Sequence, residues 1–156
     1  MANTTAVCAS FKSELMLGAH QLGAVTIVSR TSLTAPTTDT IKAALYLATG
    51  SYGVGTTVYA ATNEVANSGS YSAGGITVTN ATAPTNDGTK GYWTPSASLV
   101  ATTFSATAFD ACLLYNFTQS NRAIAVYNFG SQTITSGTFT LTMPTNNGTT
   151  GLLVIQ

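Results

Sequence analysis

The sequence predicts a mainly β protein, an antiparallel β-sandwich of about eight to ten strands with one short N-terminal α-helix. After Gly18, threonine and valine alternate with small residues in short runs. Glycine, asparagine and serine recur between these runs, as they do in turns. No later helical pattern is present that could form a crossover between parallel strands. We therefore expect one domain over residues 1–156 whose strands pair antiparallel.

Residues 6–18 have the periodicity of an amphipathic helix. Val7, Phe11 and Leu15 follow one another at a spacing of four residues and share one face. Thr5 stands where an N-cap would accept a main-chain N–H, and a glycine ends the segment. We expect this helix to cover one side or one end of the sheet structure.

The strand candidates are short runs of alternating or continuous apolar residues, each bounded by turn residues. In chain order they cover residues 24–28, 41–49, 56–61, 75–81, 92–94, 102–107, 111–117, 122–129, 133–135, 138–143 and 152–155. The glycine-rich stretches 49–55 and 67–75 are expected to be loops.

The clearest hairpin joins residues 111–117 to residues 122–129. Both arms are apolar with few polar interruptions, and the intervening Thr118-Gln119-Ser120-Asn121 is typical of a turn. A strand that is apolar throughout is buried on both faces. We expect this pair at the centre of a sheet.

The composition is unusually poor in charge. Only 6% of the residues are charged, five Lys and Arg against five Asp and Glu, whereas soluble domains carry roughly a quarter. Zero net charge argues against nucleic acid as a partner, because phosphate binding needs a basic surface. The N-terminus has neither a secretory signal nor a membrane-spanning run, so the product is expected to begin in the cytosol. With so few charges, we expect part of the surface to be covered by something else.

Side chains suited to chemistry are few. Cys8 and Cys112 are expected to be free and buried, and His20 is the only histidine, so neither a metal site, a cofactor site nor a catalytic triad is predicted. The five carboxylates are scattered along the chain, at Glu14, Asp39, Glu64, Asp87 and Asp110. No catalytic residues are assigned, and we expect no enzyme activity.

Two features have alternative interpretations. Aromatic residues near the glycine-rich loops either cap the core or form a sugar-binding platform; they are Tyr52, Tyr71, Tyr92 and Trp93. Arg122, beside the predicted turn, is either a solvated charge or an anchor for a carboxylate on a partner.

Several runs of sequence resemble small structural proteins of tailed-bacteriophage virions, some of which are capsid cement or decoration proteins. The matching order and spacing extend over most of the chain, in residues 8–20, 39–46, 63–75 and 114–130. The resemblance implies a β-sandwich that assembles on a particle and has no catalytic or cofactor-binding residues. The stretch 24–38 is longer than this resemblance implies and is either an extra hairpin or an arm that reaches a neighbour.

The function implied is that of a capsid cement protein that binds the outer surface of the capsid lattice and stabilises it. Its partners would be the major capsid protein and further copies of itself, as a trimer or dimer, with no nucleic acid and no membrane. It would be located on the virion capsid surface, and in the host cytoplasm during assembly. Neutral contacts suit this role, because they are weakly screened by salt and bury no charge.

The candidate interface consists of the N-terminal residues, the stretch 24–38 and the predicted hairpin turn. The individual residues are Ala2, Asn3, Thr4, Thr5, Asn121 and Arg122. A tail, neck or fibre-base protein of the virion is the first alternative, and a carbohydrate-binding β-sandwich module is the second. Copy number per particle distinguishes the tail, neck or fibre-base alternative from a cement protein. Glycan binding through Tyr92 or Trp93 distinguishes the carbohydrate-binding alternative.

Overall fold

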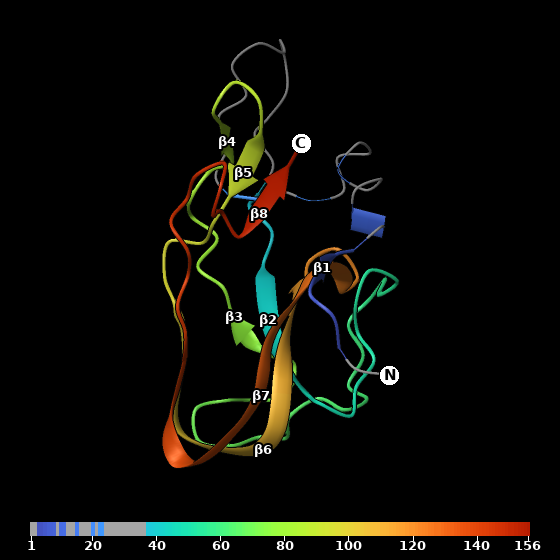
Figure 1. The fold of residues 1–156 in the computed structure, drawn as a ribbon, viewed down its shortest axis with the longest axis vertical. Helices are drawn as coiled ribbons and strands as arrows, with labels where there is room; N and C mark the ends of the chain where they lie inside the picture. Colours follow the sequence, from blue (N-terminus) through green and yellow to red (C-terminus); the bar gives the residue numbers. More distant parts are fainter. Residues whose placement is uncertain (1–2, 9, 12–14, 16–19, 21, 24–36) are drawn as a thin grey trace.

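The structure is a computed structural model that describes residues 3–8, 10–11, 15, 20, 22–23 and 37–156. Apart from Ser10, Phe11 and Leu15, which have helical backbone, the regular elements of the described residues are strands, and these form two antiparallel sheets (Figure 1). They are β1 (Ala6–Val7), β2 (Ile41–Leu47), β3 (Ile76–Thr77), β4 (Thr85–Asn86), β5 (Gly91–Trp93), β6 (Leu99–Asn116), β7 (Arg122–Leu141) and β8 (Leu153–Ile155). The expectation of a mainly β, antiparallel protein is confirmed.

The larger sheet has the strand order β1-β7-β6-β2-β3, and the smaller sheet has the order β4-β5-β8. The predicted hairpin is confirmed, since β6 and β7 pair from Asn116 and Arg122 outward and β6 is the middle strand. Ser120 and Asn121 in its turn have φ values of 54° and 60°. Two successive residues in this left-handed region give a turn whose twist matches that of the strands.

Strands β6 and β7 are much longer than the sequence predicts, at 18 and 20 residues. The predicted strands 102–107 and 111–117 are parts of β6, and 122–129, 133–135 and 138–143 fall largely within β7. The expected breaks between them are bulges, where the register shifts without ending the ladder. Because bulges bend and twist a strand pair, the hairpin curves through the lower part of the molecule in Figure 1.

The far half of this hairpin is held by a cluster of phenylalanines. The ring centroids of Phe109 and Phe139 are 5.1 Å apart, and those of Phe104 and Phe109 are 5.4 Å apart, with edge-to-face geometry in both pairs. Phe129 joins the cluster at 5.5 Å from Phe139. Phe104 and Phe109 are fully buried, so aromatic contacts fix the curvature that the bulges allow.

Several sequence expectations are corrected. The helix over residues 6–18 is not shown as a whole: Ala6 and Val7 form β1, which pairs with Val126 and Ala125 of β7. Ser10, Phe11 and Leu15 have helical backbone, and the rest of residues 9–19 lie outside the described residues. An apolar residue such as Val7 fits an edge strand as well as a helix, so the local sequence allows both structures. Pairing with β7 determines that this segment is a strand. The run 56–61 is not a strand, although Val58 makes one bridge to Arg122. Residues 24–28, and the possible arm over 24–38 except its last two residues, lie outside the described residues.

Candidate functional site

The predicted interface residues of the N-terminal segment are mostly engaged within the chain. Asn3 is only 5% exposed. Thr4 and Thr5 are exposed, but Thr4 N–H donates to Tyr52 O at 2.9 Å, and Thr5 Oγ1 accepts Asn128 N–H at 2.6 Å. Thr5 is therefore tied to β7 rather than capping a helix. Ala2 lies outside the described residues.

The other predicted interface residues lie at the β6–β7 turn. Asn121 is half-buried, and its main-chain O accepts Tyr59 N–H at 2.9 Å. Arg122 is exposed at the first position of β7. Of the six predicted positions, the structure therefore places Thr4, Thr5 and Arg122 at the surface.

Asp110 fastens the N-terminal segment inside the protein. Asn3 Nδ2 donates to Asp110 Oδ1 at 2.6 Å, and Asn128 Nδ2 donates to Asp110 Oδ2 at 3.0 Å. Asn3 Oδ1 in turn accepts Tyr52 N–H at 2.9 Å. Asp110 is 6% exposed, so its charge is stabilised by amide donors inside the fold. Its role is to hold β1 against β7.

A second buried carboxylate, Asp39, ties the segment before β2 to the β6–β7 turn. Asn116 Nδ2 donates to Asp39 Oδ2 at 2.6 Å, and Gln119 Nε2 donates to Asp39 Oδ1 at 3.3 Å. The same amide nitrogen of Asn116 is 3.1 Å from His20 Nδ1. The amide therefore stands between the histidine and the carboxylate. Asn116 is fully buried, and His20 is 9% exposed, so this group lies within the core.

Glu64 is surrounded by tyrosines. Tyr59 OH donates to Glu64 Oε2 at 2.6 Å, Tyr71 OH donates to Oε1 at 2.8 Å, and Gly74 N–H donates to Oε1 at 2.7 Å. Burial raises the pKa of the hydroxyls of Tyr59 and Tyr71 well above their usual range, and it raises the pKa of Tyr115 to about 12. These hydroxyls therefore stay protonated and act as donors near neutral pH.

The aromatic residues proposed as a sugar platform do not form one exposed surface. Trp93 and Tyr71 are each 1% exposed, and Trp93 Nε1 donates to Thr82 O at 2.8 Å. Tyr52 is half-buried, and its ring lies 3.9 Å from that of Tyr46. Trp93 and Tyr71 thus take the alternative role of core residues. Tyr92, beside Trp93, is half-buried.

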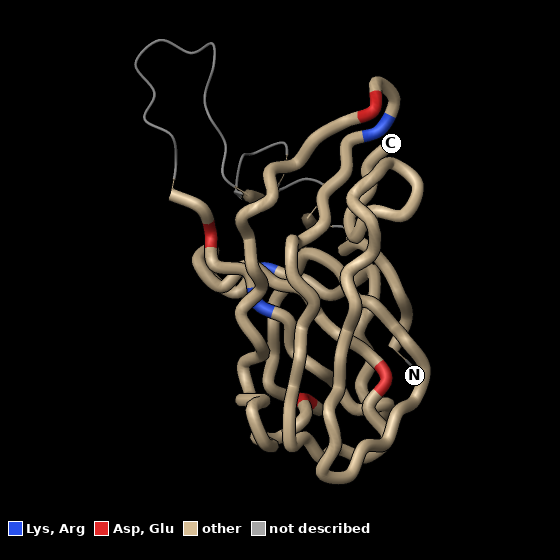
Figure 2. The backbone as a smooth tube through the Cα atoms, turned by 90° about the vertical axis from the view of Figure 1, so that its left-hand side faces the viewer, with Lys and Arg blue, Asp and Glu red and all other residues tan. Residues whose placement is uncertain are grey.

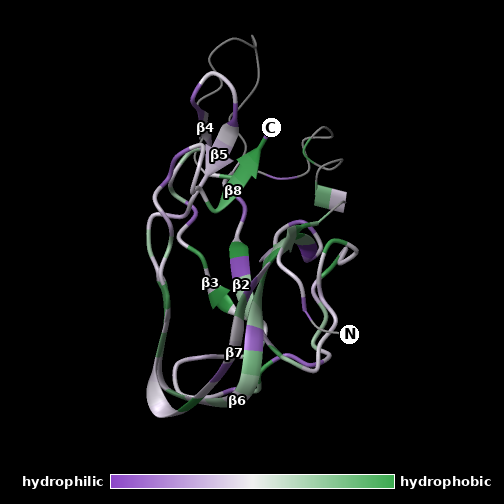
Figure 3. Cartoon of the chain, viewed as in Figure 1, coloured by the Kyte–Doolittle hydropathy of each residue, from purple (hydrophilic) through white to green (hydrophobic). Residues whose placement is uncertain are grey.

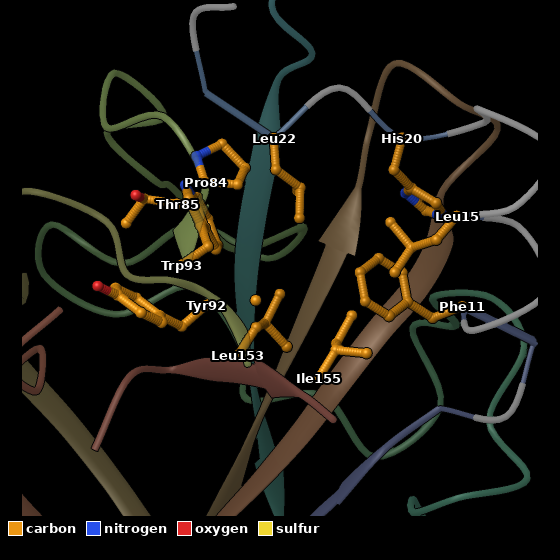
Figure 4. A pocket seen from close by; sticks show the side chains of 11 residues that line it. Phe11, Leu15, His20, Leu22, Pro84, Thr85, Tyr92, Trp93, Leu153 and Ile155 are labelled. Atoms are coloured by element: carbon orange, nitrogen blue, oxygen red, sulfur yellow. The ribbon is translucent and has the colours of Figure 1, made fainter. Parts of the chain in front are cut away.

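Tyr92 and Trp93 line a pocket of about 270 Å³ beside the smaller sheet. Figure 4 shows side chains of Phe11, Leu15 and Leu153 projecting toward the same space. Its walls are apolar, and its few polar groups include His20 and Thr85. Among the described residues that line it there is no carboxylate, lysine or arginine, so the pocket mainly offers contact to apolar groups, with His20 as a titratable side chain in its wall.

The outer surface carries very little charge. Figure 2 shows the few charged positions scattered along an otherwise uncharged backbone. Of the seven charged residues in the described part, only Asp87 and Arg122 are exposed. Hydrogen bonds from the main-chain N–H groups of Lys90 and Thr89 lower the pKa of Asp87. Figure 3 shows the bend of the β6–β7 hairpin in pale colours of intermediate hydropathy.

The cysteines are buried and not joined to each other. Burial raises the pKa of the Cys112 thiol to about 12, which makes the thiolate scarce and the group unreactive. Within the described residues, no three His, Cys, Asp or Glu side chains gather closely enough to hold a metal ion. No described helix has the length and hydropathy needed to cross a bilayer.

Comparison with known proteins gives no match, whether to a protein-family model, to a curated protein or to a solved structure.

Sequence reasoning missed the carboxylate networks. Asp110 and Asn3 are 107 positions apart, and Asp39 and Asn116 are 77 positions apart. The only sequence signal for these networks was a carboxylate within or beside an apolar run. Such a carboxylate is expected to be buried, and a buried charge needs hydrogen-bond donors around it.

Proposed function

We propose that this chain is a non-enzymatic structural protein of a bacteriophage virion, a capsid cement or decoration protein that binds the outer surface of the capsid lattice and stabilises it. The observation that carries the proposal is the distribution of charge: in the described part, Asp87 and Arg122 alone are exposed charged residues. Such a surface packs against protein without having to desolvate or pair many ions. The resemblance in sequence to small virion proteins supports the same role.

The use made of the carboxylates supports a structural rather than a catalytic role. Asp110 and Glu64 accept hydrogen bonds from amides, hydroxyls and main-chain N–H groups of distant segments. These contacts hold loops and the N-terminal segment in place. A general acid or base instead needs a carboxylate with access to substrate.

In this role the two sheets act as the layers of a β-sandwich, and residues 1–156 act as one domain. The partners are the major capsid protein and further copies of the chain. Binding to the assembled lattice but not to dissociated subunits stabilises the lattice by mass action, by about 2.7 kcal/mol at a free concentration one hundred times the dissociation constant. The protein acts on the capsid surface after synthesis in the host cytoplasm.

The test uses capsids prepared without this protein. The purified chain is added to them and centrifuged at low and at high salt. We expect cosedimentation that changes little with salt, because few charges are available for screening, together with a higher temperature for capsid disruption. Absence of cosedimentation at both salt concentrations would refute the cement role.

A location in the tail, neck or fibre base is the alternative within the virion. Electron microscopy of particles carrying a labelled chain distinguishes the two locations. Label over the capsid faces at high copy number supports the cement role, whereas label confined to the tail or neck supports the alternative. The carbohydrate-binding alternative is disfavoured by the burial of Trp93 and Tyr71.

A further inference from the structure

Among the described residues, β7 has a long edge beyond Asn128, on the side away from β6, that pairs with no other strand. The first half of β7 is covered on that side, by β1 at Ala125 and Val126 and by the bridge between Val58 and Arg122. From Gly130 to Leu141, β7 pairs only with β6 among the described strands. The opposite edge presents main-chain donors and acceptors to solvent.

The neighbouring edge of β6 is covered by the loop 68–70. Thr102 N–H donates to Ser70 Oγ at 2.8 Å, and Ser70 N–H donates to Thr102 O at 3.0 Å. Ser105 N–H donates to Ser68 Oγ at 2.8 Å. Gly69, at φ 56°, makes this approach possible, because a Cβ there would lie 2.1 Å from Thr102 O. One edge of the hairpin is therefore closed within the chain, and the other is open.

The register identifies the groups at the open edge. Leu99 is opposite Leu141, and Ala101 is opposite Phe139. Thr102 directs its N–H and C=O away from β7, to Ser70. Since direction alternates along a strand, Ala101 and Phe139 bond to each other across the hairpin. Thr138 and Thr140 therefore direct their N–H and C=O groups outward.

Exposed edges are normally blocked by charged side chains, by proline, by bulges or by shortness. The irregularities of β7 lie near Gly130 and Ser136, so its edge over residues 137–141 is regular and lacks these protections. Thr138 and Thr140 are exposed and neutral, and the sequence from residue 123 to its end contains no Asp, Glu, Lys or Arg. By contrast, the outer strands of the smaller sheet, β4 and β8, have only two and three residues.

We propose that a second copy of this chain pairs with this edge, antiparallel and about a two-fold axis. Thr138 of one copy lies opposite Thr140 of the other, and each threonine donates one main-chain hydrogen bond and accepts another. Identical charged edges would repel each other, whereas these neutral edges do not, and cross-strand threonine pairs add favourable contacts. Two-fold pairing of like edges closes on itself and gives a dimer.

The inference deepens the self-association within the proposed function and names its surface. Its test uses the free chain without capsids, so a failure to bind capsids and a failure to dimerise are separate results. We expect light scattering coupled to gel filtration to give twice the 16.0 kDa mass of the chain, at low and at high salt alike. A monomer under both conditions would overturn the inference.

Two variants test the edge, and one serves as a matched control. Thr140→Pro removes an outward N–H, which an edge strand tolerates, and should convert the dimer to a monomer. The double variant Thr138→Lys with Thr140→Lys should also be monomeric at low salt and recover dimer at high salt, since screening weakens repulsion. Thr107→Lys adds a charge to an exposed residue of β6 and should stay dimeric.

Circular dichroism establishes that each variant is folded before its mass is measured. If Thr140→Pro fails to fold, the lysine variant alone decides. A folded edge variant that dimerises as well as the unmodified chain would overturn the inference. So would loss of the dimer in Thr107→Lys alone, because the contact would then lie on β6.

Discussion

Replacing Asp110 with asparagine tests whether the buried carboxylate holds the N-terminal segment. Both oxygens of Asp110 face amide donors, Asn3 Nδ2 at 2.6 Å and Asn128 Nδ2 at 3.0 Å. An asparagine offers only one oxygen, so in either orientation one amide donor meets another. Turning the amide of Asn3 or Asn128 instead breaks its bonds to Tyr52 N–H or to Gly130 N–H.

The expected loss follows from the burial of these groups. A buried donor without a partner costs about 1–3 kcal/mol, and a hydrogen bond to a charged group exceeds a neutral one by about 1 kcal/mol. The free energy of unfolding should therefore fall by about 2–4 kcal/mol. For a chain of this length that corresponds to a decrease in Tm of roughly 4–16 °C.

Thermal and urea denaturation followed by circular dichroism measure the loss of stability. Hydrogen exchange locates it, since the main-chain N–H groups of Thr4 and Cys8, which donate to Tyr52 O and Ile124 O, should exchange faster than those of β2. Asp87→Asn is the matched control: Asp87 is exposed, and its bonds from Thr89 and Lys90 all go to Oδ1, which asparagine keeps. Its replacement should leave Tm near that of the unmodified chain. The reasoning is refuted if Asp110→Asn matches this control.

Two further outcomes follow from the described contacts. Burial raises the pKa of Tyr115 from 10.0 to about 12, so the stability that this hydroxyl contributes is fully present below pH 10 and decreases as pH rises from 10 to 12. Absorbance at alkaline pH should show that tyrosine ionisation in the folded chain is delayed to higher pH. Ionisation at the ordinary pH would contradict the prediction. Gly69→Ala should lower the free energy of unfolding by at least about 1 kcal/mol, because a positive φ disfavours a Cβ; Gly55→Ala, where a Cβ meets nothing within 4 Å, is the control, and equal stability of the two variants would refute the close packing of the loop 68–70.

The sequence predicts well where apolar pattern and turn residues agree. Residues 111–129 form the expected hairpin, and 41–49 contain β2, because continuous apolar arms have no other place than the sheet interior. Prediction fails where pattern allows two outcomes. The residues near positions 108, 130 and 136 look like strand ends in the sequence, but in the folded chain they are irregularities within β6 and β7, beside the phenylalanine cluster.

The candidate site was harder to predict, because its contacts join distant segments. In the sequence Asn3 looks like part of a free terminus. In the structure its side-chain amide donates to Asp110 and Leu47 O and accepts the N–H of Tyr52. Nothing in the local sequence distinguishes an asparagine in a loop from one that satisfies a buried carboxylate. Arg122 is exposed at the first position of β7, whereas Asn121 beside it is half-buried, so a place at the turn did not by itself predict which of the two reaches the surface.

The small number of charges and the open edge have a common physical consequence. Asp110 and Glu64 are satisfied by amides, hydroxyls and main-chain donors, so their burial requires no lysine or arginine partner. The fold thus stays stable with a nearly neutral exterior. The same neutrality removes the usual protection of the β7 edge at Thr138 and Thr140. A chain built in this way is best suited to a setting in which other protein surfaces, including further copies of itself, cover its exterior.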